Sequence, residues 1–223
     1  MREVLRGVVW GLAVLAVLGA IASRAGWVAI EVPRPTGTGP WFISRATGFA
    51  AFIALTLDVI VGLLVSTRAG DRWPGRANAI DLHGWLAPVT LALVLGHALV
   101  LLGDRYIRFD VLDVIVPFAA PYRPVAVGVG VIAAYLALVV HASFGLRKRL
   151  GARTWRRLHY LSFVAFVAAA LHAILAGTDS SRGWAVALYG FPLAVVGALI
   201  AVRVLGRRGS ARVPRLGKDV PAR

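Results

Sequence analysis

Long apolar stretches alternate with short polar or turn-forming stretches along the whole 223-residue chain. A helix needs about 20 predominantly apolar residues to cross a bilayer. Six stretches reach that length: residues 4–22, 43–66, 80–102, 124–146, 157–177 and 184–205. Segments rich in Gly, Pro, Asp and Ser separate them, as expected of turns. The pattern predicts an all-α integral membrane protein, with a six-helix bundle over residues 1–206 and a basic, disordered tail over residues 207–223.

Composition and charge support a membrane protein and indicate its orientation. Hydrophobic residues make up 59% of the chain, against about 45–50% in soluble domains. The net charge of +15 comes from Lys and Arg in short segments between apolar stretches, which is typical of topology signals and anionic lipid contacts and not of nucleic-acid binding. Eighteen of the 25 Lys and Arg residues fall on one side of the predicted bundle. This bias predicts that both termini are cytoplasmic, with the first apolar stretch kept as a helix.

The chain contains no cysteine. This excludes disulfides, iron–sulfur clusters, thiolate metal sites and covalent c-type haem attachment. Any metal or cofactor must therefore be held by other side chains.

Four of the five histidines lie in two predicted helices, His83 and His97 in one and His159 and His172 in the other. Both helices run from inside to outside in the predicted orientation, so the histidines form two levels about 20 Å apart. His83 can face His159 as an inner pair, and His97 can face His172 as an outer pair. His83 and His97 are fourteen residues apart, which brings them to nearly the same face of an α-helix. His159 and His172 are thirteen residues apart, which leaves them about 140° apart around the helix. The second helix therefore needs a tilt or a local distortion.

Paired intramembrane histidines point to haem. Neutral imidazole binds haem iron, and two axial histidines on facing helices hold a b-type haem without covalent attachment. Two such haems at two depths would carry electrons across the membrane. The alternative from another class is a haem-free transporter or scaffold protein whose histidines bind a metal or form structural hydrogen bonds.

The two spacings, H-x13-H and H-x12-H, resemble the ferric reductase-like transmembrane domain family, as do the segments "SRATGFAAF" and "RTWRRLHYLSF". That family includes NADPH oxidases, ferric-chelate reductases and the haem subunit of bacterial methionine sulfoxide reductase systems. The resemblance covers about residues 43–177. It implies a six-helix bundle with two haems b, or one, between the third and fifth helices. The implied axial ligands are His83 and His159 for the inner haem and His97 and His172 for the outer haem.

Members of this family often carry a cytoplasmic flavin and nicotinamide module, and we expect none here. The segment "GVGVIAA", residues 128–134, matches a dinucleotide-binding pattern but lies inside a predicted helix and follows no strand. We therefore expect an oxidoreductase component whose FMN or FAD belongs to a partner or to an unrecognised site. Its electron donor would be a cytoplasmic flavoprotein or a quinol, and its acceptor external. A subunit of a methionine sulfoxide reductase-type system is the alternative, and the composition suggests a bacterial plasma membrane.

Four arginines are candidate partners for haem propionates, because Arg suits carboxylates: Arg45 outside and Arg153, Arg156 and Arg157 inside. Topology and headgroup binding explain each of them as well. Interfacial anchoring explains the tryptophans near the predicted helix ends, Trp41, Trp85, Trp155 and Trp184.

Three further features stay open. Asp58 lies in the inner half of a predicted helix, where a carboxylate is costly unless paired, and His141 is one candidate partner. His141 itself is either an interfacial residue or an alternative inner ligand. The segment 104–123, with Asp110 and Asp113, is expected outside, either as an interfacial cover over the outer haem or as a plain connector.

Overall fold

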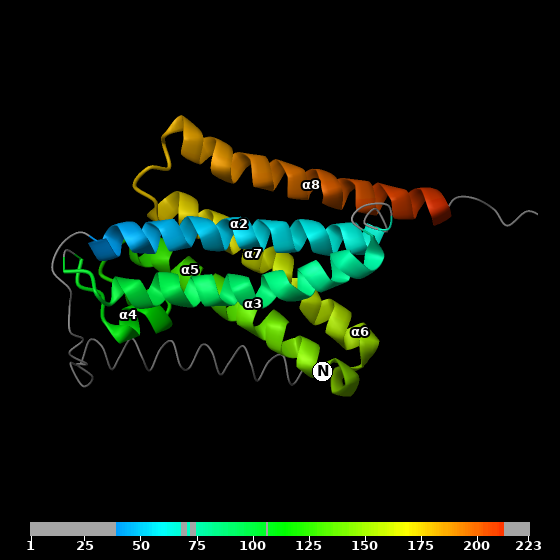
Figure 1. Ribbon diagram of the computed structural model, residues 1–223, viewed down its shortest axis with the longest axis horizontal. Coiled ribbons are helices and arrows are strands. Elements are labelled where there is room, and N and C mark those ends of the chain that lie inside the picture. Colours follow the sequence, from blue (N-terminus) through cyan, green and yellow to red (C-terminus); the bar gives the residue numbers. More distant parts are fainter. Residues whose placement is uncertain (1–38, 68–70, 72–74, 106, 212–223) are drawn as a thin grey trace, which may run out of the picture.

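The computed structural model describes residues 39–67, 71, 75–105 and 107–211, and these form a helical bundle (Figure 1). The elements are α2 (Gly39–Thr67), α3 (Arg76–Leu101), α4 (Val111–Ile115), α5 (Pro124–Gly145), α6 (Arg147–His159), α7 (Leu161–Ala176) and α8 (Gly183–Ala211). The helix predicted at residues 4–22 lies outside the described residues.

Five described segments are long and apolar enough to cross a membrane: Gly39–Thr67, Arg76–Leu101, Pro124–Gly145, Arg147–Ala176 and Gly183–Leu205. They coincide with the last five stretches predicted from hydropathy, so the prediction of an all-α membrane bundle is confirmed. Large apolar side chains cover the outer faces of these helices, and Trp85 and Phe191 are each 73% exposed. Apolar surface of this extent suits a hydrocarbon surrounding.

Two helices extend further than the apolar pattern indicated. The basic stretch from Arg147 to Arg157, which the sequence pattern left between two predicted helices, is helical in α6, with a bend at Gly151, where φ is +75°. At the other end of the chain, α8 continues to Ala211 and so includes the first residues of the expected tail. Hydropathy marks only the part of a helix that hydrocarbon can surround, whereas arginine is itself a good helix former.

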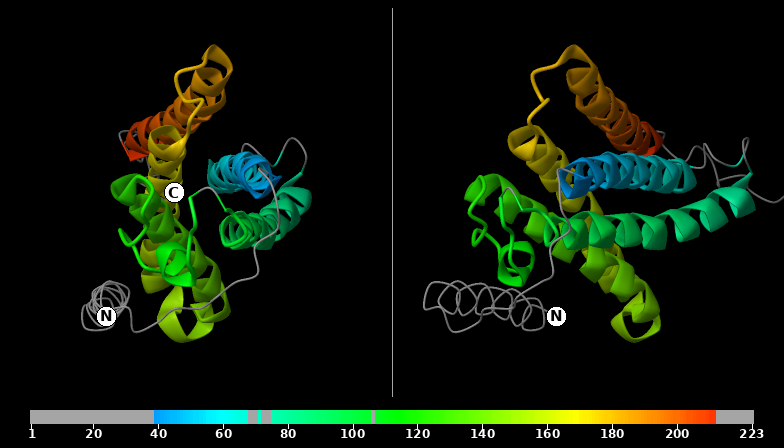
Figure 2. Two further views of the ribbon diagram at one scale, coloured as in Figure 1. Left: turned by 90° about the vertical axis from the view of Figure 1, so that its left-hand side faces the viewer. Right: turned by 60° about the vertical axis from the view of Figure 1, so that its left-hand side comes forward.

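The bundle is organised around two helix pairs, α2 with α3 and α5 with α7, as the end-on view of Figure 2 shows. Helix α8 lies along α2 on the side away from α3 (Figure 1). The aromatic rings of Phe52, Phe166 and Tyr189 join α2, α7 and α8. Phe52 stacks on Phe166 with ring centres 5.8 Å apart and meets Tyr189 edge to face at 5.6 Å. These contacts fix α7, which carries His172, against α2.

The segment between α3 and α5 folds back over the start of α5. Phe109, only 1% exposed, packs with Ala120, Val127 and Val131. The short helix α4 begins after Asp110, whose backbone N–H donates to the Asp113 carboxylate at 2.8 Å. Burial raises the pKa of the Asp113 carboxyl above its ordinary value. This segment therefore covers one end of the bundle as a packed element.

Candidate functional site

The structure brings the four intramembrane histidines together as two pairs. The ring centres of His83 and His159, the inner pair, are 6.0 Å apart, with ring planes at 85°. The ring centres of His97 and His172, the outer pair, are 6.1 Å apart, with planes at 79°. Helix α3 supplies one histidine to each pair, and the α6–α7 segment supplies the other. The two segments must therefore run in the same direction.

A break at Tyr160 compensates for part of the rotation that the spacing of thirteen leaves short. Helix α6 ends at His159 and α7 begins at Leu161. The Phe163 N–H donates to the Tyr160 carbonyl at 3.2 Å, a bond that spans three residues instead of four. Each residue of such a tight turn rotates the chain by about 120°, compared with 100° in an α-helix. Three residues of such a turn add about 60°, less than half of the 140° by which a spacing of thirteen misses the same helix face. The turn therefore rotates His172 part of the way toward the face that carries His159.

Three of the four histidines bond through Nδ1 to a backbone carbonyl of the neighbouring helix. The bonds are His83 to Asp58 O at 3.1 Å, His97 to Ser44 O at 2.7 Å and His172 to Ala126 O at 2.8 Å. A carbonyl can only accept, so Nδ1 carries the proton in each case. The other nitrogen, Nε2, then keeps its lone pair, which is the form of imidazole that binds a metal.

A glycine lies against each of these three rings, four residues after the carbonyl that accepts the bond. Gly48 faces His97, Gly62 faces His83 and Gly130 faces His172. A Cβ atom at Gly48 would lie 3.0 Å from Nδ1 of His97, and one at Gly62 would lie 3.1 Å from Cε1 of His83. Residues four apart share one face of a helix, so the missing side chain opens the path to the carbonyl.

The hydropathy pattern and the histidine spacing do not mark these glycines as part of the site. A signal was present, because Gly48 and Gly62 are fourteen residues apart, as are His83 and His97. Only the pairing of α2 with α3 shows that the two spacings belong together.

Polar side chains add a second contact at two of these rings. The Oδ1 atom of Asp58 is 2.7 Å from Nδ1 of His83, and the side chain of Asp58 is 14% exposed. The N–H of that ring is aligned with the Asp58 carbonyl, so the carboxylate contributes its charge more than a second directed bond. At the outer pair, the hydroxyl oxygen of Ser44 is 3.1 Å from Nδ1 of His97.

Of the partners left open for Asp58, the structure shows His83 and not the candidate His141. His141 is exposed on α5, whereas Asp58 contacts His83 on α3. Hydropathy gives the depth of a residue in the membrane but not the direction in which its side chain leaves the helix. Two groups at a similar depth can therefore face different neighbours.

His159, the fourth histidine, is supported by an aromatic ring. Trp155, one turn earlier in α6, stacks on it with ring centres 5.2 Å apart and planes at 28°. The indole Nε1 of Trp155 is buried and has no hydrogen-bond partner among the described residues. Trp155, expected as an interfacial anchor, is thus packed against the inner pair, and its indole N–H is available to a further acceptor.

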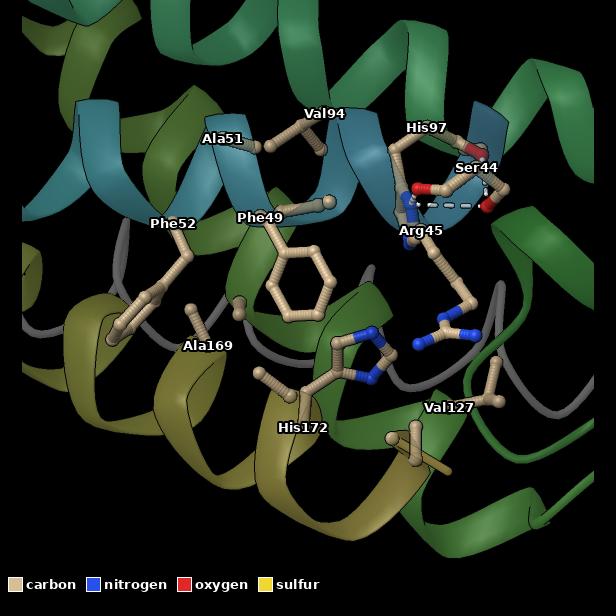
Figure 3. Close-up of a pocket in the computed structure, with 18 of the residues that line it drawn as sticks. Ser44, Arg45, Phe49, Ala51, Phe52, Val94, His97, Val127, Ala169 and His172 are labelled. Atoms are coloured by element: carbon tan, nitrogen blue, oxygen red, sulfur yellow. Dashed lines mark hydrogen bonds between the residues drawn. The ribbon is translucent and has the colours of Figure 1, made fainter. Parts of the chain in front are cut away.

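A largely apolar pocket surrounds the outer pair. Figure 3 shows His97 and His172 pointing toward each other across it, with Arg45 beside them. Apolar side chains of α2, α3, α5 and α7 line much of the pocket, among them Phe49, Val94, Val127 and Ala169. The segment before α5 contributes Phe109, Val114 and Tyr122 to one end. The hydroxyl of Thr90, halfway between His83 and His97 on α3, also lines the pocket and has no hydrogen-bond partner among the described residues.

The predicted propionate partners differ in position. Arg45 lines the outer pocket and forms an ion pair with Asp179 in the loop between α7 and α8. Arg153, Arg156 and Arg157 are exposed on α6. Arg45 is therefore the only one of the four that the structure brings to the lining of the outer pocket.

The outer end of α7 is held by side chains of the preceding loop. Arg123 donates to the carbonyls of Leu175 at 2.6 Å and Gly177 at 3.3 Å. The Tyr122 hydroxyl donates to the carbonyl of Ala176 at 3.1 Å. Carbonyls at a helix end have no partner within the helix. These bonds fix the end of α7 next to His172.

The fold and site define a multi-pass membrane protein with two levels of facing histidines between its helices. Comparison with protein families gives a match to the ferric reductase like transmembrane component over residues 47–170, more than half of the chain. The protein therefore belongs to the ferric reductase-like transmembrane family, whose members are membrane oxidoreductases. No curated protein and no solved structure matches the chain.

Proposed function

We propose that this protein carries electrons across the membrane through two b-type haems. His83 and His159 hold the inner haem, and His97 and His172 hold the outer one. The electrons come from a cytoplasmic-side donor, a flavoprotein or a quinol, and pass to an external acceptor. The observation that carries the proposal is the matched geometry of the two histidine pairs.

The distance between the rings fits a shared metal. Two imidazoles that bind one metal from opposite sides, with bonds of about 2.0 Å, would place their ring centres about 6.4 Å apart, since each centre lies about 1.2 Å behind its nitrogen. The measured separations are 6.0 Å and 6.1 Å. The agreement at both levels supports one iron between each pair.

The chemistry of the surrounding groups also fits. Three of the histidines donate Nδ1–H to a carbonyl, which fixes the tautomer and orients Nε2 toward the space between the rings. The outer pocket has the apolar lining that a porphyrin needs. Arg45 outside and, inside, the indole N–H of Trp155, which has no acceptor among the described residues, are suitable donors for propionates. When bound, a haem with two axial histidines accepts and releases one electron at its iron.

The proposed direction of electron transfer rests on the distribution of Lys and Arg along the chain. Lys and Arg dominate the segments at the end of the bundle where His83 and His159 lie, so that end is cytoplasmic. The donor then meets the inner pair first. The exposed arginines of α6 add positive charge beside that entry point.

The first test is the dithionite-reduced minus air-oxidised visible spectrum of the purified protein, with haem measured per chain. We expect low-spin b-type bands and about two haems per chain. His83→Ala and His97→Ala should each reduce the content to about one haem. His141→Ala, which removes the one histidine outside the pairs, is the matched control and should keep both. Protein made with haem available that contains none would refute the proposal.

The ring planes give a second, independent readout. The two rings of each pair, at 85° and 79°, are close to perpendicular, and a haem held between them would have ligand rings in that relation. Ferric haems with perpendicular axial rings give strongly anisotropic low-spin electron paramagnetic resonance signals, whereas parallel rings give rhombic ones. Rhombic signals from both haems would contradict the geometry of the pairs.

Electron transfer itself is tested in proteoliposomes. Ferricyanide is enclosed inside the vesicles and a membrane-impermeant reductant is added outside. We expect ferricyanide reduction with the wild-type protein, and only the rate of empty vesicles with His83→Ala or His97→Ala. Equal rates for wild type and both variants would show that the histidine pairs are not the electron path.

A further inference from the structure

We infer that Asp58 is a positioning residue that lowers the reduction potential of the inner haem below that of the outer haem, and so drives electrons outward. The inference rests on the function proposed above. It concerns the order of the two potentials, which the histidine ligands alone leave undetermined because both levels have the same pair of ligands.

The structure contains a natural comparison of three equivalent positions. Asp58, Ser44 and Ala126 each lie four residues before a glycine that faces a histidine, and each accepts the Nδ1–H of that histidine through its backbone carbonyl. The backbone contribution is therefore of the same kind at all three, at 3.1 Å for His83, 2.7 Å for His97 and 2.8 Å for His172. The side chains differ: Asp58 adds a carboxylate beside His83 and Ser44 adds a hydroxyl beside His97, whereas Ala126 has only a methyl group.

Within the part of the chain that the structure describes, only the inner pair thus has a carboxylate in contact with a ligand ring. Its Oδ1 is 2.7 Å from Nδ1 of His83, and both side chains are mostly buried. Within the membrane such a charge is weakly screened. A carboxylate beside a metal-bound imidazole makes that ligand more basic and stabilises the more positive oxidation state of the metal. The inner iron should therefore be harder to reduce than the outer one.

The cost of burying Asp58 leads to the same conclusion. A carboxylate inside a membrane-spanning helix is unfavourable without a compensating charge. Neutral His83 supplies a contact but no charge. A ferric iron held by a porphyrin and two neutral imidazoles has a net positive charge, which the ferrous state lacks. Asp58 therefore favours the ferric state of the inner haem.

One basic side chain acts in the opposite sense. Arg203 of α8 lies over the ring of Tyr160 at 5.8 Å, next to His159 in sequence, and it is half-buried. Its guanidinium is not bonded to a ligand ring, so it should offset only part of the effect of Asp58.

The transfer itself is a simple exchange of one electron, in which the inner iron goes from ferrous to ferric and the outer iron from ferric to ferrous. A reduced flavin or quinol resupplies the inner site.

The test is a redox titration of the full-length protein, followed in the visible haem bands. Asp58→Asn removes the charge but keeps the backbone carbonyl that orients His83. We expect the equilibrium constant for reduction of the inner haem to increase roughly 10- to 100-fold. At ~59 mV per tenfold, the lower of the two midpoint potentials then rises by about 60–120 mV. Asp71→Asn, the same substitution at an exposed carboxylate, is the matched control and should leave both potentials unchanged.

The reciprocal variant keeps the inference testable if Asp58→Asn loses haem. Ser44→Asp adds a carboxylate beside His97 and should lower the higher potential. The shifts are assigned to a site by repeating each substitution with only one pair intact, in His97→Ala for the inner pair and His83→Ala for the outer.

The inference is overturned if Asp58→Asn holds both haems with unchanged potentials, or if Ser44→Asp leaves the outer potential where it was. Wild-type protein without haem would instead refute the proposed function, so the two failures are distinguishable.

Discussion

The glycine that faces His172 allows a quantitative prediction. In Gly130→Ala the new Cβ would lie 2.7 Å from both Cγ and Cε1 of the ring, whereas carbon atoms pack at about 3.5–4.0 Å. The ring must therefore retreat by about 1 Å, which lengthens the bond from Nδ1 to the Ala126 carbonyl beyond hydrogen-bonding distance. That bond measures 2.8 Å in the native protein.

The energetic cost follows from these two effects. Overpacking in a tight site costs about 1–3 kcal/mol, and the lost hydrogen bond adds about 1 kcal/mol. We expect the free energy of unfolding of Gly130→Ala to be lower by about 2–4 kcal/mol than that of a variant in which a glycine in open space is replaced by alanine. Gly130→Ala should also lose the outer haem. Gly197→Ala is the matched control, because its Cβ would meet nothing within 4 Å.

The assay combines haem content per chain with the thermal unfolding midpoint in detergent. Gly48→Ala and Gly62→Ala should have smaller effects, since their Cβ atoms would approach the rings only to 3.0 Å and 3.1 Å. If Gly130→Ala keeps both haems and unfolds at the same temperature as Gly197→Ala, the proposed role of the glycine is wrong.

Three further predictions concern the outer end of the site. Arg45→Gln, which removes the ion pair with Asp179 at the pocket, should weaken retention of the outer haem but not the inner, as measured by haem content after dilution into detergent. Arg123→Ala removes the donor to two carbonyls at the end of α7 and should cost about 1.5–3 kcal/mol; a thermal midpoint equal to wild type would contradict this. Tyr135→Phe removes the bond to the Ile115 carbonyl and should cost about 1 kcal/mol, seen as faster hydrogen exchange around α4, with unchanged exchange counting against it.

Much of the fold could be read from hydropathy, because the bilayer imposes a length on each helix regardless of its neighbours. Five predicted stretches match five described membrane-spanning segments. The ends of α6 and α8 could not be read in this way. Beyond the hydrocarbon region, helix formation depends on local propensity and packing and no longer on apolar length.

The histidine pairs are an intermediate case. Their depths follow from residue number at 1.5 Å per residue, so the levels could be predicted. Their facing directions could not, since the fixed rotation per residue fails at Tyr160. The tight turn closed by the bond from Phe163 to Tyr160 supplies about 60° of the missing 140°.

The sequence by itself determined where the membrane-spanning helices lie, the charge bias between the two sides, the depths of the four intramembrane histidines and the family to which the protein belongs. Only the tertiary structure decided which groups touch those histidines. Gly130 faces His172 and Asp58 contacts His83. Such contacts depend on how each helix is rotated and shifted against its neighbour. That arrangement is set by the packing of whole faces, such as the aromatic contact of Phe52 with Phe166, and not by any local pattern of residues.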